Sequence, residues 1–135
     1  MAETIRRVSY YHVEVPDKPG EGARVFGAIQ QQGVNLVAMS AFPTKGGKSQ
    51  IDLVAASGDL EAAAAKAGLK LSAKKSAFFL TGDDRPGAVA AILKKLADAK
   101  INVIATNAAC GQTGFGMLIW VKPGDVDAAA KVLGA

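Results

Sequence analysis

The segment GDDRPGAVAAILKKLADAKINV, at residues 82–103, repeats the pattern of an earlier segment, VPDKPGEGARVFGAIQQQGVNL, at residues 15–36. The matched positions lie 67 residues apart without a gap: Asp17 and Asp84, Pro19 and Pro86, Gly20 and Gly87, Ala23 and Ala90, Asn35 and Asn102, Ala38 and Ala105, Ala41 and Ala108, Gly47 and Gly114, and Val54 and Val121. Self-similarity at one fixed offset indicates an internal duplication. The chain is therefore predicted to hold two copies of one structural unit.

The composition is typical of a soluble globular protein. The chain has 135 residues, of which 50% are hydrophobic and 21% charged, and its formal net charge is +4. The basic residues are scattered, which favours a solvated surface over a nucleic-acid footprint. The single cysteine excludes an internal disulfide, and no cysteine–histidine spacing predicts a metal site. Because the sequence shows no signal peptide and no membrane-spanning segment, we expect a cytoplasmic protein.

Each repeat is predicted to begin with a half-buried strand and to continue into an amphipathic helix. Strands are indicated by alternating apolar residues at Tyr11, Val13 and Val15, and at Phe78 and Leu80. The Asp before each Pro-Gly is typical of a residue that caps a helix start. The helix of the second repeat has an apolar stripe at spacing i, i+3, i+4, i+7, formed by Val89, Ile92, Leu93 and Leu96.

The remainder of each repeat predicts a β-hairpin, a second helix and, in the first repeat, a fourth strand over residues 69–75. The fold is therefore α+β, with two ferredoxin-like βαββαβ units at residues 1–74 and 75–135, antiparallel sheets and both helices on one face. The second unit lacks its last strand, which leaves the edge at residues 76–82 open. We expect the preceding segment, the N-terminus or a second chain in a homodimer to cover it.

The two Asp-Lys/Arg-Pro-Gly loops, each followed by an Asn at the start of the second strand, resemble the ACT domain family of small regulatory modules. The resemblance spans residues 8–133 and implies that an amino acid binds where two units meet. The ligand would lie between the loop of one unit and the second-strand Asn of its neighbour. Carried onto this sequence, the resemblance points to Asp17, Lys18, Gly20 and Asn35, and to Asp84, Arg85, Gly87 and Asn102.

The chemistry of these loops is consistent with a site for an amino acid. Amide N–H groups at a helix start can hold a carboxylate, and an Asp carboxylate can hold an ammonium group. The second loop is predicted to be the better site, because Glu21 follows the first loop whereas Arg85 lies in the second. The alternative is that the Asp and Pro residues act only as helix caps.

An RNA-recognition module is a competing interpretation, because it shares the βαββαβ order and TGFGMLIW at residues 113–120 resembles its third-strand motif. The predicted register places Phe79, Phe115, Met117 and Ile119 on the open face of the sheet, and Leu118 and Trp120 on its core face. Few of these positions carry the rings that stack on bases. We therefore interpret the open face as an interface with another subunit or domain.

No catalytic constellation is evident. The single histidine, His12, has Phe79 at its matched position, and no base is spaced to activate Cys110. We therefore expect a protein that is not an enzyme and uses no cofactor. It would sense an amino acid by altered packing of its units and act on another protein, such as an enzyme of amino-acid metabolism. The alternatives are the RNA-binding module and a scaffold that binds proteins without a ligand.

Overall fold

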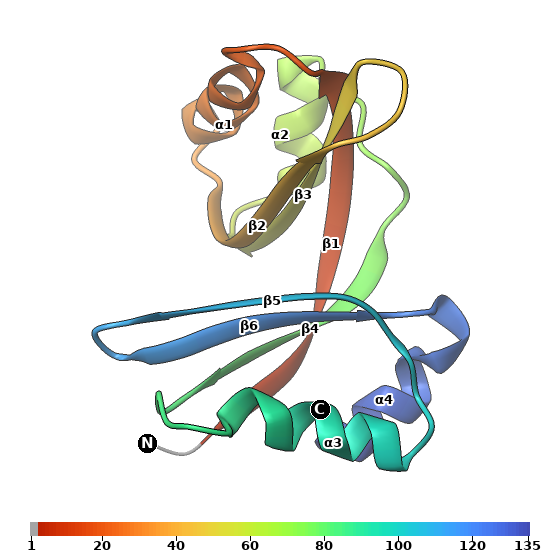
Figure 1. Ribbon diagram of the computed structural model, residues 1–135. Coiled ribbons are helices and arrows are strands. Elements are labelled where there is room, and N and C mark those ends of the chain that lie inside the picture. Colours follow the sequence, from red (N-terminus) through yellow and green to blue (C-terminus); the bar gives the residue numbers. More distant parts are fainter. Residues whose placement is uncertain (1–2) are drawn as a thin grey trace. The chain divides into compact units, whose positions relative to one another are not determined.

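The computed structural model describes residues 3–135 and contains eleven secondary-structure elements (Figure 1). In chain order they are β1 (Thr4–Pro16), α1 (Glu21–Gln31), β2 (Asn35–Pro43), β3 (Lys48–Ser57), α2 (Leu60–Ala67), β4 (Lys75–Gly82), α3 (Ala88–Asp98), β5 (Val103–Gly111), β6 (Gly114–Val121), the short 3₁₀ helix η1 (Pro123–Asp125) and α4 (Val126–Leu133). The predicted tandem of βαββαβ units is confirmed.

The chain divides into two compact units. The first unit comprises residues 9–75, and the second combines the N-terminal segment up to Val8 with residues 76–135. This division differs from the predicted ranges of 1–74 and 75–135, because the start of β1 belongs with the second repeat. Residues 1 and 2, which the predicted first unit included, lie outside the described part of the chain.

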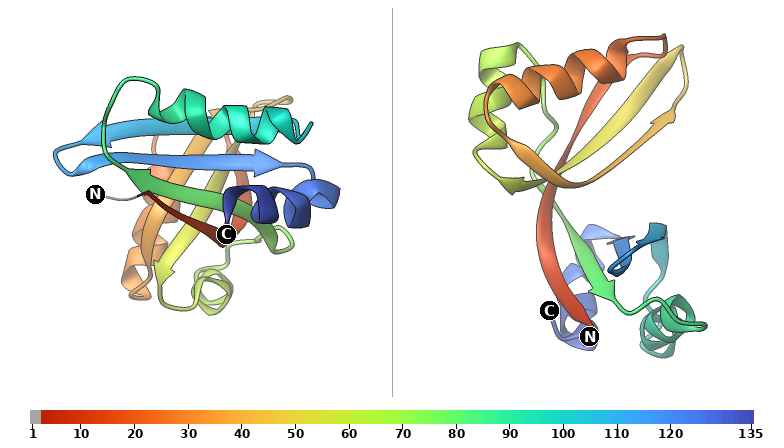
Figure 2. Two further views of the ribbon diagram at one scale, coloured as in Figure 1. Left: turned by 90° about the horizontal axis from the view of Figure 1, so that it is seen from below. Right: turned by 90° about the vertical axis from the view of Figure 1, so that its left-hand side faces the viewer.

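The first unit has three antiparallel strands in the order β2-β3-β1, with α1 and α2 side by side on one face (Figure 2, right). Tyr11 pairs with Leu53 and Val13 pairs with Ile51, which places these four side chains on the same face. They join a core under the two helices, and its other buried members are Val15, Val25, Ile29, Val34, Leu60, Ala63, Ala64 and Leu69.

The fourth strand predicted for the first unit is reduced to a single bridge between Val13 and Leu71. Two hydrogen bonds extend it. The amide of Ser72 donates to the carbonyl of His12 at 2.9 Å, and the amide of His12 donates to Ser72 Oγ at 2.9 Å.

The second unit obtains its fourth strand from the beginning of β1, and its strand order is β1-β4-β6-β5. The hydroxyl groups of Thr4 and Thr81 share a hydrogen bond, and Arg7 Nε donates to Ser76 Oγ at 3.4 Å. Ile5 packs against the core beneath α3 and α4. Of the three predicted covers for the edge at residues 76–82, the N-terminus is therefore the one observed.

The second unit corrects the predicted faces of β6. In antiparallel strands, directly opposed residues share a face, and Phe78 lies opposite Ile119 and Leu80 opposite Met117. Ile119, Met117 and Phe115 are consequently buried in the core with the helices, not on the open face. The face with Phe79 instead carries Leu118 and Trp120, which were expected on the core face. The prediction failed because β6 has apolar residues on both of its faces, so its sequence does not show which face is buried.

Candidate ligand-binding site

The loop between β1 and α1 places unpaired amide groups at the start of a helix. Gly20 precedes α1 with φ of 93°, a left-handed conformation that favours glycine. The first hydrogen bond that closes a turn of α1 runs from the Arg24 amide to the Gly20 carbonyl, at 3.0 Å. The amides of Gly22 and Ala23 therefore have no partner within the helix, which makes this end suited to an anion.

Asp17 is held by the β2–β3 hairpin and does not cap the helix, which corrects the alternative that it acts only as a helix cap. Its amide donates to the Gly47 carbonyl at 2.9 Å, and its Oδ1 accepts from Ser49 Oγ at 2.9 Å. Neither α1 nor α3 has a side-chain hydrogen bond at its N-cap, and both begin after a left-handed glycine. The Asp17 carboxylate therefore lies beside the helix start without capping it by a hydrogen bond.

A cavity of about 230 Å³ lies beside this loop, entirely within the first unit. The loop and helix supply Asp17, Lys18, Glu21 and Gly22, and the strands supply Val15, Pro16, Ala41, Phe42, Pro43, Ser49 and Ile51. The cavity thus combines an apolar wall with charged groups of both signs. Asp17 and Lys18 were predicted, whereas the contribution of β2 was missed. The one available signal was Phe42, a large apolar residue next to the Pro43–Gly47 turn, and 44% of it is exposed.

Glu21 was expected to weaken the first loop by repelling a carboxylate, but its charge is paired. Arg24 donates from both Nη2, at 3.1 Å to Oε1, and Nε, at 3.2 Å to Oε2. The hydrogen bonds from Arg24 lower the pKa of Glu21, with a smaller contribution from the charges of Arg24 and Lys18. Glu21 remains ionised at neutral pH, and Arg24 offsets part of its repulsion.

The second loop presents Asp84, Arg85 and Gly87 on the surface. Gly87 has φ of 84° and precedes α3 in the same way as Gly20 precedes α1. The guanidinium of Arg85 lies 3.4 Å from a carboxylate oxygen of Glu3, which arrives with the N-terminal strand. A carboxylate from the protein itself therefore already contacts the arginine that was expected to attract a ligand.

The two asparagines lie away from the loop of their own unit. Asn35 begins β2 and pairs with Ser57 at the end of β3, whereas the loop follows Pro16, which pairs with Lys48 at the start of β3. Asn102 directly precedes β5, and Cys110 at the other end of β5 pairs with Phe115, the partner of Gly82. Within each unit, the asparagine and the loop thus occupy opposite ends of the sheet.

The described residues give little support for a metal site or a membrane-spanning helix. Residues 3–135 contain no group of three or more His, Cys, Asp or Glu side chains able to hold a metal ion. In the same range, no helix has the length and apolar character needed to cross a membrane. Cys110 is a free, exposed thiol on β5.

No protein family model matches this sequence. No curated protein matches it either.

Solved structures, in contrast, are similar over nearly the whole chain. Protein BT0572 from Bacteroides thetaiotaomicron superposes with a TM-score of 0.80 at 14% identity, covering 96% of this chain and 88% of that one. The regulatory subunit of aspartate kinase from Thermus thermophilus, in its ligand-free form, gives 0.66 at 14% identity and 98% and 94% coverage. The corresponding subunit from Thermus flavus gives 0.59 at 15% identity with the same coverage. At these identities the likeness establishes the fold alone, and that fold is the expected tandem of βαββαβ units.

Proposed function

We propose that this chain is a regulatory module that binds a free amino acid, or a related molecule with amino and carboxylate groups, at the β1–α1 loop of the first unit. The observation that carries this proposal is the cavity of about 230 Å³ that brings the Asp17 carboxylate and the start of α1 together. The amides of Gly22 and Ala23 would bind the ligand carboxylate, and Asp17 would bind its ammonium group. The apolar wall would contact the ligand side chain.

The second loop is proposed as a weaker site of the same kind, formed by Asp84, Arg85 and Gly87. Its ligand would compete with Glu3 for Arg85, which reverses the ranking expected from the sequence. A role for Asn35 and Asn102 would require each to meet the loop of a neighbouring unit. That role stays part of the proposal and is tested by the same binding measurements.

Regulation by ligand binding, rather than catalysis, is supported by the similarity to regulatory subunits of aspartate kinase. We propose that the chain acts on an enzyme of amino-acid metabolism in the cytoplasm and uses no cofactor. RNA binding has lost support, since Phe115 and Met117 are buried in the core and cannot stack on bases. If adding the ligand-saturated chain left the kcat and KM of such an enzyme unchanged, this regulatory role would be contradicted.

The binding proposal predicts a thermal shift. A ligand at a hundred times its Kd stabilises a folded protein by about 2.7 kcal/mol. Thermal unfolding should therefore rise by several degrees with one or a few of the common amino acids. For a ligand of this loop, Asp17→Asn should abolish most of the shift, because the neutral amide cannot pair with the ammonium group, while the matched Asp84→Asn should retain it.

The same experiment distinguishes the alternatives. A shift that is lost in Asp84→Asn and kept in Asp17→Asn would assign the ligand to the second loop. A shift with a short single-stranded RNA, and with no amino acid, would replace the proposal by nucleic-acid binding. No shift with any ligand would contradict the sensor and favour a scaffold.

A homodimer is also proposed, now through a sheet edge. β5 pairs with β6 on one side, all nine of its residues are uncharged, and it is exposed from Ile104 onward. Such an edge is suited to pairing with a second copy. Sedimentation velocity at micromolar concentration should show a dimer that Ile104→Lys dissociates, whereas Met39→Lys on the β2 edge should leave it intact. A monomer in the wild-type chain, or a dimer lost only in Met39→Lys, would contradict this interface.

A further inference from the structure

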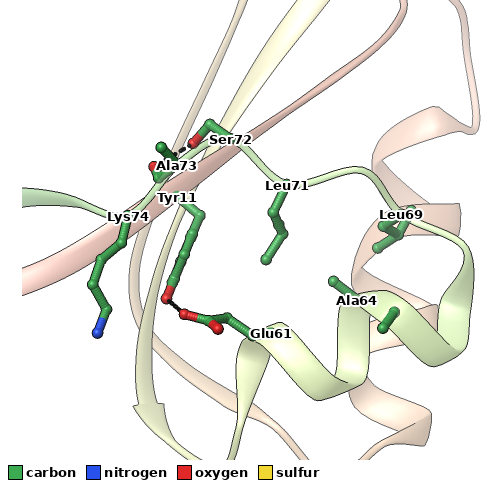
Figure 3. A pocket seen from close by; sticks show the side chains of 9 residues that line it. Tyr11, Glu61, Ala64, Leu69, Leu71, Ser72, Ala73 and Lys74 are labelled. Atoms are coloured by element: carbon green, nitrogen blue, oxygen red, sulfur yellow. Dashed lines mark hydrogen bonds between the residues drawn. The ribbon is translucent and has the colours of Figure 1, made fainter.

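A second cavity, of about 360 Å³, lies in the first unit between β1, α2 and residues 69–74 (Figure 3). It is lined by Tyr11, Glu61, Ala64, Ala65, Leu69, Leu71, Ser72, Ala73 and Lys74. None of these residues lines the loop cavity. Its volume lies within the range of small-molecule sites, about 300–1,000 Å³.

The cavity exists because the segment after α2 only partly fills the place of a fourth strand. Gly68 ends α2 in a left-handed conformation, with φ of 71°. The following residues return to β1 through the single bridge at Leu71. On the facing side α2 presents Ala64 and Ala65, whose side chains are too small to occupy the space. Leu69 and Leu71 complete an apolar wall (Figure 3).

The lining of the cavity includes two groups of opposite charge, Glu61 and Lys74. The Tyr11 hydroxyl donates a hydrogen bond to Oε1 of Glu61, while Oε2 has no hydrogen-bond partner within residues 3–135. Burial, and secondarily the hydrogen bond to Glu61, raises the pKa of Tyr11 to about 12, so this hydroxyl remains a donor that orients the carboxylate. The Lys74 side chain extends beside the Tyr11 ring (Figure 3). Among the described residues, Lys74 has no ion-pair partner.

The corresponding place in the second unit has different side chains. Phe78, 67 residues after Tyr11, is fully buried and has no hydroxyl group. Asp127 occupies the position of Glu61 in the last helix, and it forms an ion pair with Arg7 of the N-terminal strand at 3.0 Å. In the first unit, Glu61 on α2 instead accepts a hydrogen bond from Tyr11. Lys74 has no ion-pair partner among the described residues.

We propose that this cavity is a second binding site, for a free α-amino acid with an aliphatic side chain. The ligand ammonium would pair with Oε2 of Glu61, and its carboxylate with Lys74 Nζ. Its side chain would lie against Leu69, Leu71 and Ala64. A carboxylate and an ammonium group that line the same cavity as an apolar wall match a zwitterion better than an amine or an acid alone.

Isothermal titration calorimetry of the full chain with L-leucine tests this site, with 3-methylbutylamine and 4-methylpentanoate as probes that lack one charge. Leucine should bind saturably. Each probe should bind with an affinity at least about tenfold lower, because one charge-assisted contact is lost. If either probe bound as well as leucine, the proposed pairing of both charges would be overturned. Absence of saturable leucine binding up to a leucine concentration of about 10 mM would overturn the site itself.

Variants separate this site from the loop cavity. Glu61→Gln keeps an acceptor for Tyr11 but removes the charge, and it should weaken leucine binding about tenfold; Asp127→Asn, its match in the second unit, should not. Ala65→Leu fills the cavity and should abolish binding, whereas Ala62→Leu, on the exposed side of α2, should preserve it. Asp17→Asn should leave leucine binding at this cavity unchanged. Leucine binding that is lost in Asp17→Asn and kept in Ala65→Leu would assign the ligand to the loop and refute the second site.

Discussion

Phe78→Ala should destabilise the second unit by about 3–5 kcal/mol, the usual cost of truncating a buried phenylalanine. Phe78 is fully buried, lies opposite Ile119 and packs beneath α3 and α4. The loss is a large share of the total stability of about 5–15 kcal/mol that typical domains possess. Urea unfolding followed by the fluorescence of Trp120, the single tryptophan and a member of this unit, would measure it.

The neighbouring ring provides a matched control. Phe79 points to the opposite face of β4, where the guanidinium of Arg6 lies 5.4 Å from its ring centroid. Phe79 is only half-buried, so Phe79→Ala should cost no more than about 2 kcal/mol, including about 0.5–1 kcal/mol for the cation–π contact. Equal costs for the two variants would contradict the face assignment of β4.

Ile5→Asp should destabilise the second unit by about 2–4 kcal/mol, although Ile5 lies 71 residues before Ser76, where the rest of that unit begins. The variant removes an apolar side chain that packs on the core, which is worth about 1.5–3 kcal/mol when fully buried. It also brings a carboxylate into a partly apolar environment, which adds a desolvation cost. The urea transition of Trp120 is again the measurement.

The control for Ile5→Asp is Arg6→Ala, one residue along the same strand. Arg6 contacts Phe79 on the other face, so its loss should cost at most about 1 kcal/mol. If Ile5→Asp left the Trp120 transition unchanged, the N-terminal residues would not form the fourth strand of the second unit.

Most of the local structure could be predicted from the sequence, because it depends on neighbours along the chain. The stripe of Val89, Ile92, Leu93 and Leu96 predicted α3, and the glycine-containing turns predicted both hairpins. The constant offset of the Asp-Pro-Gly loops predicted two similar units. The candidate site was anticipated in part, since Asp17 and Lys18 do line a cavity.

The errors arose where distant segments pair. The face of β6 could not be read from a strand that is apolar at every position from Met117 to Val121, and it was decided by register with Phe78 and Leu80. The cap expected at Asp17 was replaced by a hydrogen bond from Ser49, which lies across the hairpin. The cavity under α2 depends on how residues 69–74 return to β1, and no local pattern describes that path.

The sequence by itself determined the duplication and the order of helices and strands. Each of these follows from periodicity or from backbone sterics within a few residues. Only the tertiary structure decided that residues 3–8 complete the second unit, which side of β6 faces the core, and where the first unit leaves space beneath its last helix. The physical reason is that strand pairing and burial are contacts between segments far apart in the chain, and several pairings satisfy the same local pattern.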